Sequence, residues 1–251
     1  MQKKISPHSF HLPVMGIAFT IDSPIKIAKY GISSVISIVD DVLIEKMNEY
    51  YSTKFKIPYQ AISTKVEDYR AKRITSYLNT VDTIVKHKFE ILKKSFDEKN
   101  SEFEKYMDML PDFSELKQNF IRTFQHNTLK EDLNNWIQNN LKLGSIDVNI
   151  MTKLDKANYN KKEMLPTEFN DAHAALRGFA NSNLESSVVL SAGMNPRLYS
   201  YFENFNAFFP DEENYLKKKI ILKVSDYRSA IIQGKFLAKK GLWVSEYRIE
   251  S

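Results

Sequence analysis

Short apolar runs alternate with stretches of helical periodicity over much of the chain. Residues 11–41 hold an apolar run, a polar turn at Pro24, a short helical pattern that ends at Gly31, and a second apolar run. This order predicts a strand, a helix and a parallel strand. Asp40 and Asp41 follow the second run, so we expect them at the C-terminal edge of a sheet, where folds of this class place their chemistry.

The middle of the chain has a purely helical pattern. Over residues 65–96, apolar positions recur every three or four residues with charged residues between them, which predicts a long amphipathic helix. Shorter patterns of the same kind follow at 101–110, 112–124 and 129–141. Together they predict an α-helical insertion over residues 54–143, far longer than a usual strand-to-helix connection. Two interpretations stay open: a packed cap without chemistry of its own, or a module that docks a protein partner.

Strand patterns return from residue 144 onward. Apolar, mostly β-branched runs lie at 145–154, 186–191, 218–224 and 242–249. With helices between them, about six strands predict a parallel α/β fold. In the first of these runs, Asp147 and Asn149 alternate with isoleucine and valine, which predicts one apolar face and one polar face.

The most specific expectation for the fold is a parallel (β/α) barrel of the aldolase type, with the helical insertion after its second strand. Such a barrel has eight units and takes about 250 residues without insertions. We therefore expect an incomplete barrel, with a doubly wound sheet as the alternative. Residues 1–53 are predicted to form the first βαβα units, 54–143 the helical insertion or cap, and 144–251 further βα units.

Composition narrows the function classes. The 251 residues are 43% hydrophobic, enough for a substantial core, and 36 Lys and Arg against 31 Asp and Glu give a mild net charge of +5. The basic residues are interleaved with acidic ones, unlike the one-sided clusters of nucleic-acid-binding surfaces. The chain has no cysteine, which excludes disulfides, cysteine-ligated zinc and thiol catalysis within it. No apolar run approaches the roughly 18 residues of a membrane span, so we expect a cytoplasmic protein without membrane contact.

Candidate catalytic residues lie at the ends of the predicted strands. Lys223 stands in the apolar run IILKV, where desolvation would lower its pKa and favour a Schiff base or proton transfer. The alternative is an inward lysine paired with a strand carboxylate such as Asp147 or Glu246. Lys153 has the same two interpretations, and Glu246 is the third catalytic candidate. The five histidines are dispersed without metal-binding spacing, so no metal site is expected.

One stretch resembles a known family. Residues 13–16 read Pro-Val-Met-Gly on the first strand, residues 23–25 read Ser-Pro-Ile at a helix start, and Gly31 precedes the second strand. This pattern resembles the opening of the nitronate monooxygenase-like (2-nitropropane dioxygenase-like) FMN barrels. The resemblance implies an aldolase-type (β/α)₈ barrel, FMN, and oxidation of a small carbon acid. The family's Gly-Gly-His segment and its late glycine-rich phosphate loops have no counterpart before Ser251, so the resemblance implies an N-terminal portion of such a barrel.

By this resemblance, Met15 and Gly16 approach the flavin ring and Lys153 lies near it. We count Asn149 and Ser191 with them as cofactor-binding candidates. The leading hypothesis is thus a flavin-dependent oxidoreductase acting on a small molecule. The alternatives are a lyase or aldolase that forms a Schiff base with Lys223 or Lys153, and a non-enzymatic protein that forms a homo-oligomer or docks a partner through its helical segment.

Overall fold

The structure is a computed structural model, and it describes residues 7–15, 20–38, 40–124 and 130–250. These residues divide into two compact units. Among the described residues, the first unit comprises 36–82 and 147–250, and the second comprises 7–35 and 83–146. The predicted boundaries at residues 54 and 144 stay predictions.

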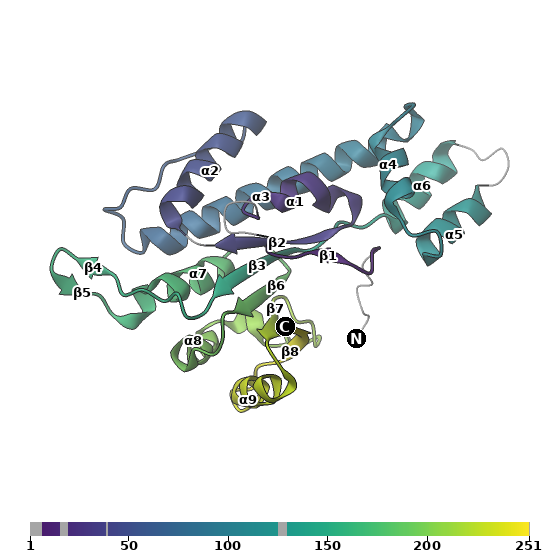
Figure 1. Cartoon of the computed structure of the whole chain (residues 1–251). Helices are drawn as coiled ribbons and strands as arrows, with labels where there is room; N and C mark the ends of the chain where they lie inside the picture. Colours follow the sequence, from purple (N-terminus) through teal and green to yellow (C-terminus); the bar gives the residue numbers. More distant parts are fainter. Residues whose placement is uncertain (1–6, 16–19, 39, 125–129, 251) are drawn as a thin grey trace. The chain divides into compact units, whose positions relative to one another are not determined.

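Six strands form one sheet in the order β1-β2-β3-β6-β7-β8 (Figure 1). Their bounds are His11–Leu12 (β1), Ser33–Ile38 (β2), Ile146–Met151 (β3), Ser187–Ser191 (β6), Lys219–Val224 (β7) and Val244–Ile249 (β8). The pairs β1/β2, β3/β6, β6/β7 and β7/β8 are parallel. The parallel α/β prediction is therefore confirmed. Strand order never reverses among these six, unlike in a doubly wound sheet, where reversal creates the ligand crevice.

Helices connect the strands in the expected rhythm. Their bounds are Ser23–Ile27 (α1), Asp41–Phe55 (α2), Tyr69–Lys94 (α3), Glu102–Met109 (α4), Glu115–Thr123 (α5), Lys130–Asn140 (α6), Asp171–Ala180 (α7), Pro196–Tyr201 (α8) and Tyr227–Ala238 (α9). Short strands Tyr159–Asn160 (β4) and Glu163–Met164 (β5) form an antiparallel hairpin between β3 and α7. This hairpin was not predicted. That α3 to α6 are an insertion into a barrel stays a prediction.

Local sequence explains where several helices begin. The Asp40 side chain accepts hydrogen bonds from the backbone N–H groups of Val42 and Leu43 at the start of α2. Ser101 and Glu104 form a reciprocal capping box at the start of α4. Asp226 caps α9 through the N–H of Ser229. These caps satisfy backbone donors that have no partner inside a helix.

The second unit has its own helical core. In it, the end of α3 packs with α4 and α6 around the buried residues Phe89, Leu92, Phe103, Tyr106, Met107, Leu110, Ile137 and Leu141. Rings of Phe120 and Trp136 lie against this core with centroids 5.2 Å apart. Glu102 adds a polar network, since it accepts a hydrogen bond from the Tyr30 hydroxyl and forms ion pairs with Lys29 and Lys105.

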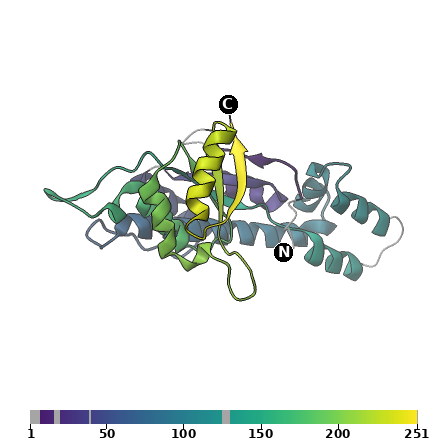
Figure 2. The ribbon, with the colours of Figure 1, turned by 90° about the horizontal axis from the view of Figure 1, so that it is seen from below.

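In the first unit, one face of the sheet packs against helices. The side chains of this face are almost fully buried; they include Ile36, Val148, Ile150, Val188, Leu190, Ile220 and Leu222. α7 lies close to α3 because Gly178 has no side chain there: a Cβ would come within 2.7 Å of Ile74 Cγ2. Figure 2 shows α9 beside β8 at the end of the sheet. Within the described residues, no helix is both long and apolar enough to cross a membrane.

Candidate functional site

The other face of the sheet in the first unit carries most of the predicted site residues. Strand pairing aligns Asn149 with Val189, Val189 with Ile221, and Ile221 with Glu246. Because side chains alternate along a strand, Ser191 and Lys223 lie on this same face, two residues further along their strands. We call it the polar face. The predicted alternation of apolar and polar residues on β3 is confirmed, because Asn149 donates a hydrogen bond to Ser37 of β2 at 3.2 Å.

An ion pair shows that the polar face is concave. The Nη2 of Arg248 on β8 lies 4.0 Å from Oδ2 of Asp147 on β3, and Asp147 is 4% exposed. Two strands stand between these residues, which is about 14 Å in a flat sheet. The register aligns Arg248 with Met151, so Asp147 lies a further four residues, or about 13 Å, along β3. The two side chains cannot span that diagonal unless the sheet curves toward them.

Two catalytic candidates on the polar face form ion pairs with neighbouring side chains. Lys223 Nζ lies 2.7 Å from Glu250 Oε2. The alternative of a paired lysine therefore describes Lys223, although its partner is Glu250 rather than Asp147 or Glu246. Glu246 in turn accepts a hydrogen bond from Arg248 Nε at 2.5 Å. Both candidates thus lie on the polar face in ion pairs with neighbouring residues.

Asn149 has one unsatisfied atom. Its side chain is 2% exposed, its amide nitrogen donates to Ser37, and its Oδ1 has no partner among the described residues. A buried carbonyl oxygen without a donor costs free energy, on the order of 1–3 kcal/mol. A ligand or a water with an N–H or O–H group at the polar face would remove that cost.

Lys153 lies at the C-terminal edge of the sheet, just beyond β3. Its aliphatic chain covers Gly193, whose φ is +95°, and a Cβ at Gly193 would come within 2.6 Å of Lys153 Cε. Thr152 fixes this edge by donating its hydroxyl to the carbonyls of Ser191 and Gly193. Lys153 itself is exposed, and its ammonium makes no ion pair or hydrogen bond with the described part of the chain. Lys153 and Ser191 both lie at this edge of the sheet; that they bind a cofactor stays a prediction.

Asp155 ties this edge to the next helix. Its Oδ1 accepts the backbone N–H groups of Ala172 and His173 in the first turn of α7, and its Oδ2 lies 2.8 Å from Nδ1 of His173. The amide of Asn195, which begins α8, donates to the Thr152 carbonyl at 2.9 Å. Burial opposes ionisation of Asp155, but the donors of His173 and Asn170 outweigh it and lower the pKa of this carboxyl. Asp155 therefore holds the β3–α7 loop, and Lys153 with it, in one conformation.

Two cofactor-binding candidates, Met15 and Gly16, are not among the described residues of the first unit. Met15 belongs to the second unit, where it follows β1 and is 65% exposed. Gly16 lies outside the described residues. Their predicted approach to a flavin ring stays a prediction.

Sequence reasoning missed Lys218, which precedes β7. Lys218 is 1% exposed, and its ammonium donates to the carbonyls of Ser182 and Leu184 and lies 4.3 Å from the ring centroid of Phe179. Burial lowers its pKa to about 7. Because Lys218 lies at the N-terminal end of its strand, we assign it to stability rather than to chemistry. Its neighbour Lys219 begins the strand, and nothing in the sequence distinguished the two.

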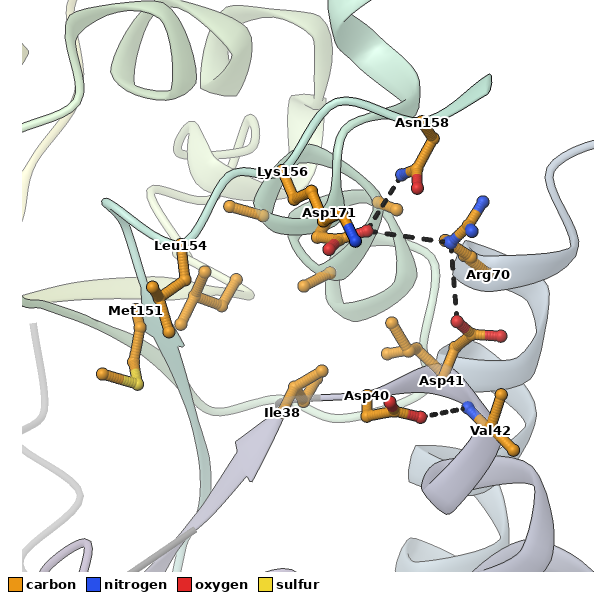
Figure 3. Close-up of a pocket in the computed structure, with 15 residues that line it drawn as sticks. Ile38, Asp40, Asp41, Val42, Arg70, Met151, Leu154, Lys156, Asn158 and Asp171 are labelled. Carbon is orange, nitrogen blue, oxygen red and sulfur yellow. Dashed lines mark hydrogen bonds and ion pairs between the residues drawn. The ribbon is translucent and has the colours of Figure 1, made fainter. Parts of the chain in front are cut away.

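A separate cavity of about 270 Å³ lies in the first unit (Figure 3). Its walls come from the ends of β2 and β3, from α3, and from the start of α7. The charged residues that line it are Asp40, Asp41, Arg70, Lys156 and Asp171. None of the catalytic or cofactor-binding residues predicted from the sequence lines this cavity, whereas Asp40 and Asp41, which were predicted at the C-terminal edge of the sheet, do line it.

Comparisons with known proteins add no identification. No family model, no curated protein and no solved structure matches this chain. Within the described ranges, no group of three or more histidine, aspartate and glutamate side chains is placed to hold a metal ion.

Proposed function

We propose that the chain forms the first six strands of a (β/α)₈ barrel and belongs to a flavin-dependent oxidoreductase similar to the nitronate monooxygenases. The observation that carries the proposal is the unbroken order of parallel strands around a concave polar face. Sequential order is the order of the strands in a (β/α)₈ barrel. The offset between Arg248 and Asp147 is also in keeping with it, because strands in that barrel are staggered by about one residue per strand.

The side chains of the polar face suit one part of FMN. The isoalloxazine ring carries an N–H group and carbonyl oxygens along one edge. Asn149 Oδ1 is a buried acceptor without a donor, and the Lys153 ammonium is a cation without a carboxylate partner among the described residues. An acceptor and a cation of this kind suit that polar edge. They fit the ring only, because the described residues include no glycine-rich phosphate loop of the kind that holds a nucleotide.

In this proposal each residue has a defined task. Asn149 accepts a hydrogen bond from the ring, and Ser37 holds the Asn149 amide in that orientation. Lys153 places a positive charge where negative charge increases on reduction. FMN, when bound, supplies the capacity to accept electrons from a small carbon acid. Asp155 keeps Lys153 in position by fixing the loop that follows β3.

A direct experiment tests the proposed activity. Purified protein is incubated with FMN and an alkyl nitronate, and loss of the nitronate is followed together with the visible flavin spectrum. The proposal expects nitronate consumption that requires FMN and falls at least about tenfold in Lys153→Met. A protein that does not perturb the FMN spectrum at any concentration overturns it.

A second candidate function rests on the exposed, unpaired ammonium of Lys153. A lysine that attacks a carbonyl compound to form a Schiff base must have its amine free of other partners, and Lys153 meets that condition among the described residues. Lys223 is less suited, because its ammonium is held by Glu250 at 2.7 Å. Borohydride trapping of a small aldehyde separates the two functions: a covalent adduct that disappears in Lys153→Ala, but not in Lys223→Ala, favours the lyase.

A further inference from the structure

The cavity shown in Figure 3 lies on the side of the sheet opposite to the polar face. Ile38 and Ile150 line it. Their sequence neighbours Ser37 and Asn149 point to the polar face and are bonded to each other there. Because neighbouring side chains on a strand point to opposite sides, Ile38 and Ile150 face away from Asn149 and the proposed flavin ring, and Met151, at the end of β3, is the one described strand residue of the lining on the same side as Asn149. The side chains that line the cavity therefore need a separate explanation.

The floor of the cavity is aliphatic. It is formed by strand residues Ile38 and Ile150, by Ile74 of α3, and by the small residues Ala172 and Ala175 of α7. The two alanines leave room that larger side chains on α7 would fill. At about 270 Å³, the cavity is near the lower end of ligand pockets, which hold about 300–1,000 Å³. A small branched aliphatic group fits these walls.

The rim carries charges of both signs. Asp41 lies 2.7 Å from Arg73 and 3.4 Å from Arg70, so it is neutralised within the protein. Asp171 uses Oδ1 to accept a hydrogen bond from Asn158 at 2.9 Å and lies 3.7 Å from Arg70. The contacts of Arg70 with Asp41 and Asp171, and that of Asn158 with Asp171, are drawn as dashed lines in Figure 3 and hold the rim in place.

Two rim groups keep binding capacity after these contacts. Oδ2 of Asp171 and the ammonium of Lys156 make no hydrogen bond or ion pair with any residue that the structure describes. Asp40 lines the same cavity and uses Oδ1 alone to cap α2. Three acidic and two basic residues line the cavity, and Asp41 is already paired with Arg70 and Arg73. A ligand with one positive and one negative group would pair with both the free carboxylate oxygen of Asp171 and the free ammonium of Lys156.

We propose that this cavity binds an amphoteric small molecule, namely an α-amino acid with a short branched aliphatic side chain. Its ammonium group pairs with Asp171 Oδ2. Its carboxylate pairs with Lys156, and its side chain lies on the floor formed by Ile38, Ile150 and Ala175. This site goes beyond the proposed flavin chemistry and does not depend on it.

Calorimetric titration of the 251-residue chain with L-leucine tests the proposal. Two analogues each remove one head group: 4-methylpentanoic acid lacks the ammonium, and 3-methylbutylamine lacks the carboxylate. We expect saturable binding of leucine and at least about tenfold weaker binding of each analogue, which is about 1.4 kcal/mol. Absence of saturable binding by leucine overturns the proposal. Equal binding of leucine and 3-methylbutylamine also overturns it, because the site would then recognise only a cation.

Three variants test whether leucine binds in this cavity. Lys156→Met is expected to weaken leucine about tenfold, while its control Lys162→Met, in the turn between β4 and β5, leaves the affinity unchanged. Ala175→Leu fills the floor without touching a charge, so it is expected to abolish leucine binding in a protein that still melts cooperatively. Equal affinities of Lys156→Met and Lys162→Met, or undiminished binding by Ala175→Leu, contradict the assignment. FMN titrations of the same variants are expected to be unchanged, which separates this site from the proposed function.

Discussion

The guanidinium of Arg248 lies 4.0 Å from the carboxylate of Asp147, although the strands that carry them are separated by two others. This contact requires the sheet of the first unit to curve around its polar face. Asn149, Ser191, Lys223 and Glu246 are thereby gathered on a concave surface. The candidate chemistry of the chain depends on that curvature.

Asp147→Asn is expected to destabilise the protein by about 1–3 kcal/mol in urea unfolding. Removing one partner of a buried pair leaves the other charge poorly compensated, and Asp147 also accepts the N–H of Ser187 at 3.0 Å. Glu246 still faces Arg248, which limits the loss. The control Glu246→Gln removes a more exposed carboxylate and is expected to cost less than about 1 kcal/mol. Equal stabilities of the two variants would show that the contact across the sheet contributes nothing.

Lys218 is expected to make stability depend on pH above neutrality. Its folded pKa of about 7 is below that of an unfolded lysine, so between about pH 7 and about pH 10 the unfolded chain binds more protons. Stability therefore rises with pH over this range, by at most about 1.4 kcal/mol per pH unit. Urea midpoints at several pH values should show this rise in the wild type and in the exposed control Lys162→Met. The rise in stability with pH should be absent in Lys218→Met. If Lys218→Met still shows the rise, groups other than Lys218 cause it.

Glu102 is expected to contribute to acid stability in the second unit. Burial alone would raise its pKa, but Lys29, Tyr30 and Lys105 outweigh burial and lower it to about 2. The folded pKa is below the unfolded one, so this contribution is complete above about pH 4.5 and is lost as the pH falls toward 2. Glu102→Gln should lower stability at pH 7 by about 1 kcal/mol, a figure reduced for solvent screening, and by nothing near pH 2. The exposed control Glu98→Gln should match the wild type throughout.

Gly193 is expected to set the position of Lys153. Alanine there must adopt a φ of +95° and displaces the Lys153 side chain, since its Cβ would lie 2.6 Å from Cε. Gly241 is a matched control: its φ is +73°, but an added Cβ meets only Phe209 at an ordinary 3.6 Å. Both alanine variants should lose about 1–2 kcal/mol of stability from backbone strain. Only Gly193→Ala should also weaken FMN binding. Equal FMN affinities of Gly193→Ala and Gly241→Ala would show that the position of Lys153 does not matter for FMN binding.

The fold was largely predictable because its strands and helices carry strong periodicity. The run KIILKV became β7, and the helical pattern of residues 65–96 became α3. The hairpin of β4 and β5 was missed because its strands have two residues each and show no alternation. The role of Asp155 was also not predicted: from a distant position in the sequence, its carboxylate accepts the N–H groups of the first turn of α7. Local patterns do not contain such contacts.

The candidate site was predictable only in part. Strand alternation correctly grouped Asn149 with the polar face of β3. It did not give the partner of Lys223, because Glu250 stands at the end of another strand and its proximity depends on register. Lys218 and the cavity depend on packing between distant segments, which leaves no local signal in the sequence.

Titration of FMN with this protein, followed by quenching of flavin fluorescence, tests the central claim most directly. The account predicts saturable quenching by the wild type, with affinity reduced about tenfold in Asn149→Leu because the buried acceptor is lost. The conservative variant Asn149→Gln should retain part of the affinity. Absence of quenching, or equal quenching by the wild type and Asn149→Leu, would contradict a flavin site on the polar face.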